Sequence, residues 1–396
     1  MIQSVHGVIS MEQKNSKKIY NIGLLGFGAM GQTHAYAVHN FPYFYKDLPF
    51  SARIKGVATR SMEKSLRVCE QYSFDTAYPD EDAILADPAI DIIDICTPNC
   101  LHFETLKKAI VAGKAIYCEK PLCVSFEQAR EIAALAAEHH TVGHIVFNNR
   151  HLAPIRRARQ LIDEGKIGRI LSFRAEYLHN SALNIQKNAG WKQDKTVCGG
   201  GVLFDLGSHV IDLIYSLCGE FHSVSGLAQI AYPTRIGMNG ESWQTNADEA
   251  FYMTAVLKNG ACGTIIASKL ENGANDDLNI EVVGEKGALR FSLMEPNWLY
   301  FYDSTVADAP IGGMRGYTRI ECVGRYPAPA GAFPSPKAAR GWLEGHVESM
   351  LHFMTQVHLG ESGHPDFNDA AHVQAVMEVA YSSAASNGIR VEVPGL

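Results

Sequence analysis

The chain has 396 residues, of which 46% are hydrophobic and 19% are charged, and its formal net charge is −7. This length exceeds what one ordinary hydrophobic core holds, so we expect more than one domain. The 35 basic and 42 acidic side chains form no basic block, which argues against a nucleic-acid binder. No apolar run reaches about 18 residues, which argues against a membrane partner. The charged fraction lies below the usual ~25%, which favours a large or oligomeric enzyme.

Residues 1–18 are polar and lack the apolar core of a secretory signal, so we expect a flexible tail. The nine cysteines are an odd number without paired CxxC spacing. Reduced, mostly buried thiols are their plain interpretation, which favours a cytoplasmic location. The histidines show no HExxH spacing, and we predict no metal site.

A glycine-rich turn follows the first apolar run, residues 19–25, and precedes a helical stretch. Strand, glycine turn and helix form the context in which GxGxxG predicts a dinucleotide site. The first glycine allows the tight turn, the second lets the backbone approach a pyrophosphate, and the third lets helix pack against strand. Free N–H groups at the helix start then hold the anion. The predicted cofactor-binding residues of this turn are Gly26, Phe27, Gly28, Ala29, Met30 and Gly31.

Strands and helices then alternate along the N-terminal third. Further strands are predicted at 53–58, 90–96, 115–118 and 142–147, and helices at 62–72, 102–112 and 126–140. Near-continuous apolar runs suit parallel strands that are covered on both faces. We therefore expect an α/β fold with a doubly wound, parallel Rossmann sheet in residues 19–150, and a ligand across the carboxyl ends of its strands.

The end of the second strand lacks the acid that usually binds a ribose 2′-hydroxyl. Thr59, Arg60 and Ser61 stand there after an aromatic insert, Phe41 to Phe44, which lengthens the connection. A hydroxyl and a guanidinium suit a 2′-phosphate, so we predict that these three residues bind NADP in preference to NAD. The alternative is that Arg60 is an exposed cation and that either cofactor binds through the ribose.

Several short segments between residues 19 and 215 together resemble the Gfo/Idh/MocA family of nicotinamide-dependent sugar and cyclitol oxidoreductases. The segments are Thr97-Pro98-Asn99 with His102, Ala112-Gly113-Lys114, Cys118-Glu119-Lys120-Pro121, Gly165-Lys166-Ile167-Gly168, and Gly199-Gly200-Gly201 with Asp205, Gly207, His209 and Asp212. The resemblance implies hydride transfer between NAD(P) and a secondary alcohol or ketone of a sugar, sugar derivative or inositol. The further predicted cofactor-binding residues are Thr97, Pro98, Asn99, His102, Glu119 and Lys120.

Three residues carry the predicted catalysis. Lys120 follows a strand that ends at the cofactor edge and precedes Pro121, and in the family this Lys–Pro bond is often cis. Its ammonium can bind a substrate hydroxyl and stabilise an alkoxide. Asp205 and His209 are four residues apart, so a helix places them on one face. His209 is predicted to transfer the hydroxyl proton, and Asp205 to orient His209 or the substrate. Asp212 is interpreted as a structural or supporting carboxylate.

Residues 151–396 are expected to form an α+β domain for substrate binding and oligomerisation. Its predicted strands are 169–177, 250–257, 263–270, 279–283 and 287–291, and its predicted helices are 155–164, 342–359 and 369–384. They indicate a large, mostly antiparallel sheet. In the family one face of this sheet commonly forms the oligomer interface, so we expect a homodimer or homotetramer. A proline-rich stretch, 296–336, predicts an irregular connection.

The substrate-binding residues are predicted from the edge of this domain that faces the nicotinamide. Cyclic polyols need several hydrogen-bonding groups and often an aromatic face. Besides Lys120, Asp205 and His209, the candidates are Arg150, Tyr177, His179, Trp191 and Lys192. Two other functions remain open: an NAD-dependent glycosidase that oxidises a ring hydroxyl transiently, and a regulator that binds NAD(P) without catalysis.

Overall fold

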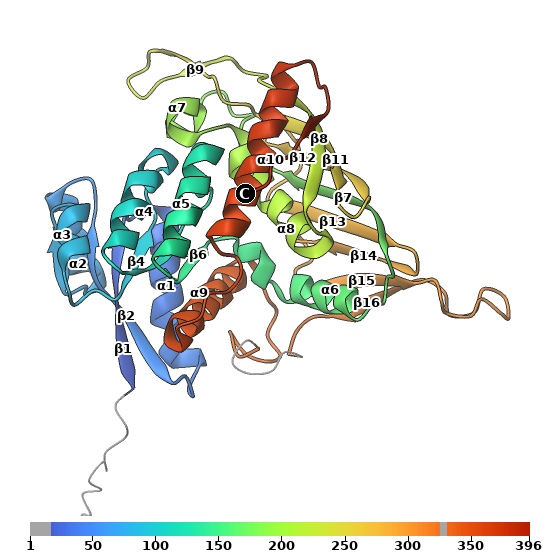
Figure 1. Cartoon of the computed structure of the whole chain (residues 1–396), viewed down its shortest axis with the longest axis horizontal. Helices are drawn as coiled ribbons and strands as arrows, with labels where there is room; N and C mark the ends of the chain where they lie inside the picture. The colour runs from blue at the N-terminus through green and yellow to red at the C-terminus, as the bar shows by residue number, and fades with distance from the viewer. Residues whose placement is uncertain (1–16, 325–330) are drawn as a thin grey trace, which may run out of the picture.

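The computed structural model of the chain describes residues 17–324 and 331–396 (Figure 1). Two sheets organise these residues, a parallel sheet built from the N-terminal third and a mixed sheet built from the later part. This arrangement confirms the predicted fold class. The tail predicted at 1–18 lies mostly outside the described residues, and the first strand begins at Lys18.

The first sheet has six parallel strands in the order β3-β2-β1-β4-β5-β6. In this doubly wound order the direction of winding reverses between β1 and β4, and ligands bind beyond the carboxyl ends at that point. The central strand β4 is buried along its whole length, which explains its continuous apolar run. The strands are β1 (Lys18–Leu25), β2 (Phe50–Ala58), β3 (Thr76–Tyr78), β4 (Ile92–Ile95), β5 (Ala115–Cys118) and β6 (Gly143–Ile145).

Helices connect these strands. Three of the helices begin at capping side chains, since Ser61, Asp80 and Ser125 each accept a hydrogen bond from a backbone N–H of the first turn. The aromatic insert, Phe41 to Phe44, lengthens the connection between the first two strands as the end of the first helix, which continues to Phe44. The helices are α1 (Ala29–Phe44), α2 (Met62–Tyr72), α3 (Glu81–Ala86), α4 (His102–Val111) and α5 (Phe126–Glu138).

The second sheet has nine strands in the order β16-β15-β14-β13-β7-β12-β11-β8-β17. Only β7 and β12 pair in parallel among these described strands, and the other neighbours are antiparallel. The strands are β7 (Ile170–Leu178), β8 (Phe221–Gln229), β11 (Ala250–Leu257), β12 (Cys262–Ser268), β13 (Asp277–Gly284), β14 (Gly287–Ser292), β15 (Trp298–Asp303), β16 (Tyr317–Glu321) and β17 (Val391–Glu392). A separate hairpin pairs β9 (Thr234–Ile236) with β10 (Ser242–Gln244).

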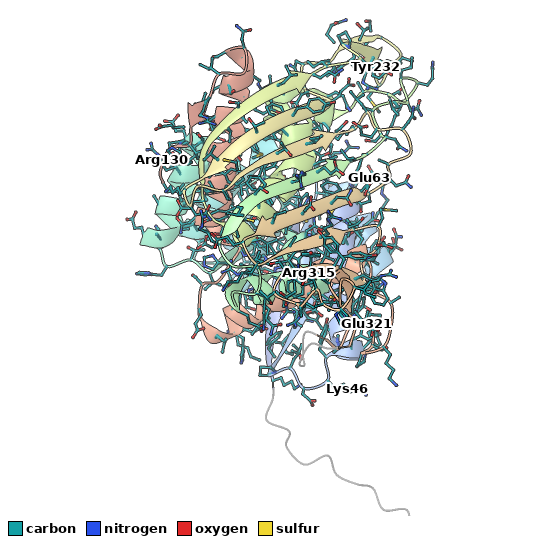
Figure 2. All side chains as sticks on the ribbon, turned by 90° about the vertical axis from the view of Figure 1, so that its right-hand side faces the viewer. Lys46, Glu63, Arg130, Tyr232, Arg315 and Glu321 are labelled. Atoms are coloured by element: carbon teal, nitrogen blue, oxygen red, sulfur yellow. The ribbon has the colours of Figure 1, made fainter. Side chains whose placement is uncertain are left out.

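Helices cover one face of the second sheet, and its other face crosses the front of the molecule in Figure 2. The helices on the covered face include α6 (Ala153–Asp163) and α8 (Ser208–Cys218). One helical stretch within the described residues, Lys195–Cys218, is long and apolar enough to cross a membrane, but 83% of its most apolar window is buried inside the fold.

The two C-terminal helices bind the halves of the molecule together. Helix α9 (Trp342–Leu359) places Val347, Met350 and Phe353 in the core of the first sheet, although it follows the second sheet in sequence. Helix α10 (Phe367–Ala385) contacts both α5 and β8 (Figure 1). The domain boundary at residue 150 therefore stays a prediction. Helix α9 belongs to the second predicted domain in sequence but packs against the first sheet. Within the stretch predicted to be irregular, β15 and β16 are regular strands, and residues 325–330 lie outside the description.

Candidate active site

One cavity of about 1200 Å³ lies where β1, β4 and β5 end and where the second sheet meets the first. Its size exceeds that of a typical single-ligand pocket, which suits a cofactor together with a substrate. The predicted site residues that line it are Gly26, Phe27, Gly28, Ala29, Met30, Thr59, Arg60, Thr97, Pro98, Asn99, Glu119, Lys120, Tyr177, His179, Trp191, Lys192, Asp205 and His209.

The glycine turn between β1 and α1 fits a dinucleotide. Gly26 has a φ of +87°, and a Cβ atom there would lie 2.6 Å from the carbonyl oxygen of Cys96. A Cβ on Gly31 would lie 2.6 Å from the carbonyl oxygen of Gly26, so this glycine lets the helix approach the turn. Gly28 has open space in front of it and lines the cavity. These positions leave the start of α1 free to receive a pyrophosphate.

Two cationic side chains, Arg60 and Lys64, line the part of the cavity that follows the end of β2. Arg60 is exposed and lines the cavity, and Lys64 donates a hydrogen bond from Nζ to the carbonyl oxygen of Phe27 at 3.4 Å. Thr59 is tied to helix α2 through Ser65, whose Oγ atom lies 3.0 Å from the backbone nitrogen of Thr59. Ser61 caps α2 and does not line the cavity.

Lys120 projects from the end of β5 toward Asp205. Its peptide bond to Pro121 is cis. The Nζ atom donates to the backbone carbonyl oxygen of Asp205 at 2.5 Å and lies 3.4 Å from Oδ1 of the same residue. Burial lowers the pKa of Lys120, while the charge of Asp205 opposes this shift.

Three lysines surround the carboxylate of Asp205. Lys192 lies 2.8 Å from Oδ1 and 3.0 Å from Oδ2, and Lys269, which follows β12, lies 2.8 Å from Oδ2. Burial alone would raise the pKa of Asp205, but the lysines hold it well below its usual value. The carboxylate is therefore ionised and held in place from several sides.

His209 lies in helix α8 and is half-buried beside Tyr177, with ring centroids 5.9 Å apart. Burial and the charge of Lys120 hold the pKa of His209 well below its usual value, so its imidazole is neutral near pH 7. Its Nδ1 atom has no hydrogen-bond partner among the described residues. A hydrogen bond from His209 to the carboxylate of Asp205, which an orienting role for Asp205 would require, is absent from the described contacts. The carboxylate oxygens of Asp205 bind Lys192 and Lys269 instead.

The local backbone explains how Asp205 reaches the site. Residues Leu203–Gly207 form a π-helical turn ahead of α8, a feature common at functional sites. Gly201 precedes this turn and packs against Asp248. A Cβ atom on Gly201 would lie 2.2 Å from the backbone oxygen of Asp248. The glycine run therefore allows the close approach that places the turn over the cavity.

Tyr177 and His179, two of the predicted substrate-binding residues, both contact the carboxylate of Asp276. Tyr177 donates a hydrogen bond to Oδ1 of Asp276 at 2.5 Å, and Nε2 of His179 lies 3.2 Å from the same atom. These residues come from the end of β7 and the segment before β13, and all of them line the cavity. They form the side of the cavity opposite the glycine turn.

Besides Gly31 and Ser61, two predicted residues lie outside the cavity lining, Arg150 and His102. Arg150 does not line the cavity, because its guanidinium binds Asp212 at 2.6 and 2.8 Å and Asp369 at 3.1 Å. His102 is also buried outside the cavity lining, with its ring nitrogens 3.0 Å from the carbonyl oxygens of Thr97 and Pro121. His102 thus supports the two loops that bear cofactor-site residues, and Arg150 supports the fold.

Several residues of the cavity were not identified from the sequence. Asp276 lies just before β13, and Trp342 and His346 lie in the first turn and a half of α9. Lys269, which contacts Asp205 from the end of β12 but does not line the cavity, was not identified either. In the sequence, Gly341 before Trp342 marks the start of a helix. It does not indicate that this helix contributes to a binding site. The helical spacing of α9 predicts a core helix, which is true of its later turns.

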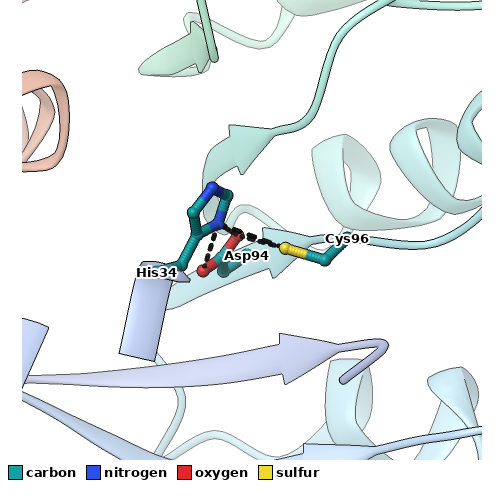
Figure 3. A group of neighbouring side chains, drawn as sticks. All are labelled: His34, Asp94 and Cys96. Atoms are coloured by element: carbon teal, nitrogen blue, oxygen red, sulfur yellow. Dashed lines mark hydrogen bonds and ion pairs between the residues drawn. The ribbon is translucent and has the colours of Figure 1, made fainter. Parts of the chain in front are cut away.

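His34, Asp94 and Cys96 form a polar group at the end of β4 (Figure 3). Nδ1 of His34 lies 2.9 Å from Oδ1 of Asp94 and 3.1 Å from Sγ of Cys96. Its Nε2 lies 3.2 Å from Oε1 of Glu119. Burial alone would lower the pKa of His34, but Asp94 and the hydrogen bonds raise it well above its usual value. A charged His34 therefore links two buried carboxylates. Its Nδ1 atom, with Asp94 and Cys96, also has the spacing of a metal-ligand set.

Comparisons with known proteins agree with this geometry. A family model described as an oxidoreductase family with an NAD-binding Rossmann fold matches residues 20–147, and the Gfo/Idh/MocA C-terminal domain matches residues 155–290. The chain is 29% identical to levoglucosan dehydrogenase from Pseudarthrobacter phenanthrenivorans, over 94% of this chain and 98% of that protein. It is 25% identical to glucose-6-phosphate 3-dehydrogenase from Bacillus subtilis, over 91% of this chain and 95% of that protein.

A solved structure of levoglucosan dehydrogenase in complex with NADH and levoglucosan has the same fold. It aligns with a TM-score of 0.90 at 29% identity, covering 96% of this chain and 100% of the other. The family models match both the segment that forms the glycine turn and the segment that bears Asp205 and His209. The chain belongs to the Gfo/Idh/MocA family of oxidoreductases, as its sequence motifs predicted.

Proposed function

We propose that this oxidoreductase transfers hydride between NAD(P) and a secondary alcohol of a sugar, a sugar derivative or an inositol. The observation that carries the proposal is that one cavity joins the glycine turn to Lys120 and His209. The names of the relatives, levoglucosan dehydrogenase and glucose-6-phosphate 3-dehydrogenase, support a sugar as substrate. When bound, the oxidised nicotinamide would accept the hydride that leaves the carbinol carbon.

The protein's own groups would handle the proton. Lys120 donates a hydrogen bond from Nζ to the hydroxyl oxygen and stabilises negative charge on it. His209 is neutral near pH 7 because of burial, so a ring nitrogen can accept the hydroxyl proton as the C–O bond becomes a carbonyl. Asp205 accepts hydrogen bonds from Lys120 and Lys192 and thereby fixes the position of the Lys120 ammonium.

A substrate panel tests this function. Purified protein is incubated with levoglucosan, common aldoses, sugar phosphates, inositols and aryl glycosides, each with NAD and with NADP, and reduced nicotinamide is followed by absorbance. At least one sugar or inositol is expected to give cofactor-dependent turnover. Cofactor binding without turnover on the whole panel would contradict the proposal and would favour a regulator. Release of an aryl leaving group without net reduction would favour the glycosidase reaction.

For the cofactor, we propose a preference for NADP. Arg60 and Lys64 support it, because both cations lie at the end of the cavity beyond β2 where a 2′-phosphate would be placed. Arg60→Ala is expected to weaken NADP binding about tenfold and to change NAD binding much less. Isothermal titration with both cofactors measures this. An unchanged ratio of the two affinities would refute the role of Arg60.

We also propose that the protein is a homo-oligomer that uses the outer face of the second sheet. The described helices leave this face uncovered (Figure 2), and Leu227 and Tyr252 pair across β8 and β11 with 63% and 37% of their surfaces exposed. Tyr252→Glu is expected to shift the protein toward monomer in analytical ultracentrifugation. A wild-type monomer at micromolar concentration would contradict this. No disulfide joins the cysteines within the described residues, which supports a cytoplasmic location.

A further inference from the structure

We propose that the mouth of the cavity holds a second-ring subsite, formed by Trp191 and Trp342, and that the substrate is therefore a glycoside. The sugar ring that is oxidised would lie on Lys120 and His209, and a further sugar or aromatic ring would lie against the two indoles. This inference rests on the proposed function and narrows it to a class of substrate.

Both tryptophans line the catalytic end of the cavity. Trp191 precedes Lys192, whose ammonium contacts Asp205 at 2.8 Å. The ring centroid of Trp342 lies 4.4 Å from that of His346, and His346 lies close enough to Lys120 for the charge of that lysine to lower its pKa. The opposite end, beyond β2, is lined by Arg60 and Lys64. The indoles are therefore placed for the substrate and not for the adenine of a cofactor.

Exposure increases from the catalytic groups to the tryptophans. The side chains of Lys120 and Asp205 are 12% and 20% exposed, whereas Trp191 and Trp342 are 42% and 38% exposed. Tryptophan is mostly buried in folded proteins, and large exposed aromatic surface around a pocket marks binding. One sugar ring on Lys120 would leave these indoles in water. A second ring beyond it would cover them.

The chemistry of this mouth favours a neutral ring over an anionic group. Burial lowers the pKa of His346 to about 3, so its imidazole is uncharged near pH 7. The ammonium groups of Lys192 and Lys269 are already bound to Asp205, each at 2.8 Å. Indoles bind the C–H faces of sugars and the faces of aromatic rings. A phosphate or carboxylate would have to displace Asp205 from its lysines.

The subsite depends on a segment outside the matched family domains. Trp342 and His346 begin helix α9, whereas the family models match residues 20–147 and 155–290. Helix α9 is anchored by its later turns in the core of the first sheet, which fixes the position of its first turn at the cavity. Trp342 therefore has a fixed position at the cavity, although it lies outside residues 20–147, which match the NAD-binding family model.

The experiment compares free sugars with their glycosides. D-glucose, D-galactose and D-xylose and their p-nitrophenyl β-glycosides are tested with the preferred cofactor, and kcat/KM is measured for each pair. At least one glycoside is expected to exceed its free sugar by about tenfold, the scale of an aromatic stacking contact. Trp342→Ala is expected to reduce this ratio by about tenfold, and Trp342→Phe to restore most of it.

A matched control is Trp298→Ala, which removes a tryptophan of β15 that does not line the cavity and stacks with Arg319 instead. Its ratio of kcat/KM for the glycoside to kcat/KM for the free sugar is expected to equal that of the wild type.

Equal kcat/KM for free sugars and glycosides in the wild type, or an unchanged ratio in Trp342→Ala, overturns the subsite but leaves the proposed function intact. Absence of turnover on these compounds and on the whole panel of sugars, sugar phosphates and inositols, with cofactor bound, overturns the proposed function itself. Binding of the same pairs to the protein saturated with reduced cofactor, measured by calorimetry, gives a second readout and must show the same preference.

Discussion

Replacing His34 by leucine removes the cation that lies between the carboxylates of Asp94 and Glu119. The side chains of His34 and Asp94 are each 1% exposed and that of Glu119 is 9% exposed, so water cannot replace the lost partner. Breaking a buried ion pair from one side costs about 3–5 kcal/mol. We expect the free energy of unfolding of His34→Leu to fall by this amount near pH 6.5.

The pH dependence of the difference in unfolding free energy between the wild type and His34→Leu tests whether the charge of His34 causes it. The pKa of His34 is raised in the folded protein, so its stabilising contribution is fully present below the unfolded value of about 6.5 and is lost as pH rises through the folded value. In that window the stability of the wild type relative to His34→Leu is expected to fall by about 1.4 kcal/mol per pH unit.

Urea denaturation of both proteins at several pH values from 6.5 to 9 measures the difference. The double variant His34→Leu/Asp94→Asn is the control, because removing one of the stranded carboxylates should recover part of the loss. Parallel stability curves for the wild type and His34→Leu would refute the charged state of His34, and so would a loss well below 1 kcal/mol.

Three further predictions concern the fold and the polar group of Figure 3. Arg150→Met is expected to lower the free energy of unfolding by about 3–5 kcal/mol in urea denaturation, because Asp212 and Asp369 lose a buried partner; a raised KM at unchanged stability would instead restore its predicted substrate role. Asp366→Ala is expected to cost about 1 kcal/mol in the same assay, because Asp366 caps α10 through the backbone N–H of Asp369. Dialysis against a chelator is expected to change neither kcat nor stability, because Nδ1 of His34 is already bound by the carboxylate of Asp94 at 2.9 Å; a loss that Zn²⁺ restores would show a metal at His34, Asp94 and Cys96.

Much of the first sheet could be predicted from the sequence because its signals are local. The strand 115–118 and the helix 62–72 have the predicted bounds, since a buried strand gives a continuous apolar run and a capped helix begins at a serine. Strand β3 and helix α3 were missed because they are three and six residues long. Strand β8, which carries several small and polar residues, was missed as well.

Sequence motifs identified several residues that the structure brings together. The glycine turn, Lys120, Asp205 and His209 line one cavity. The contact of Lys269 with Asp205 and the place of Trp342 in the cavity could not be predicted, because only the tertiary fold brings the end of β12 and the start of α9 to these positions. Arg150 was misplaced for the same reason, since its partners lie 62 and 219 positions away in the chain.

The most direct test of the proposed chemistry is kcat of Lys120→Met on a sugar that the wild type oxidises, at saturating cofactor. Loss of a hydrogen-bond donor to the developing alkoxide is expected to lower kcat by about 10²–10³-fold. The affinity for the cofactor, measured by calorimetry, should change far less than kcat does. A variant that retains the full wild-type kcat would contradict the account.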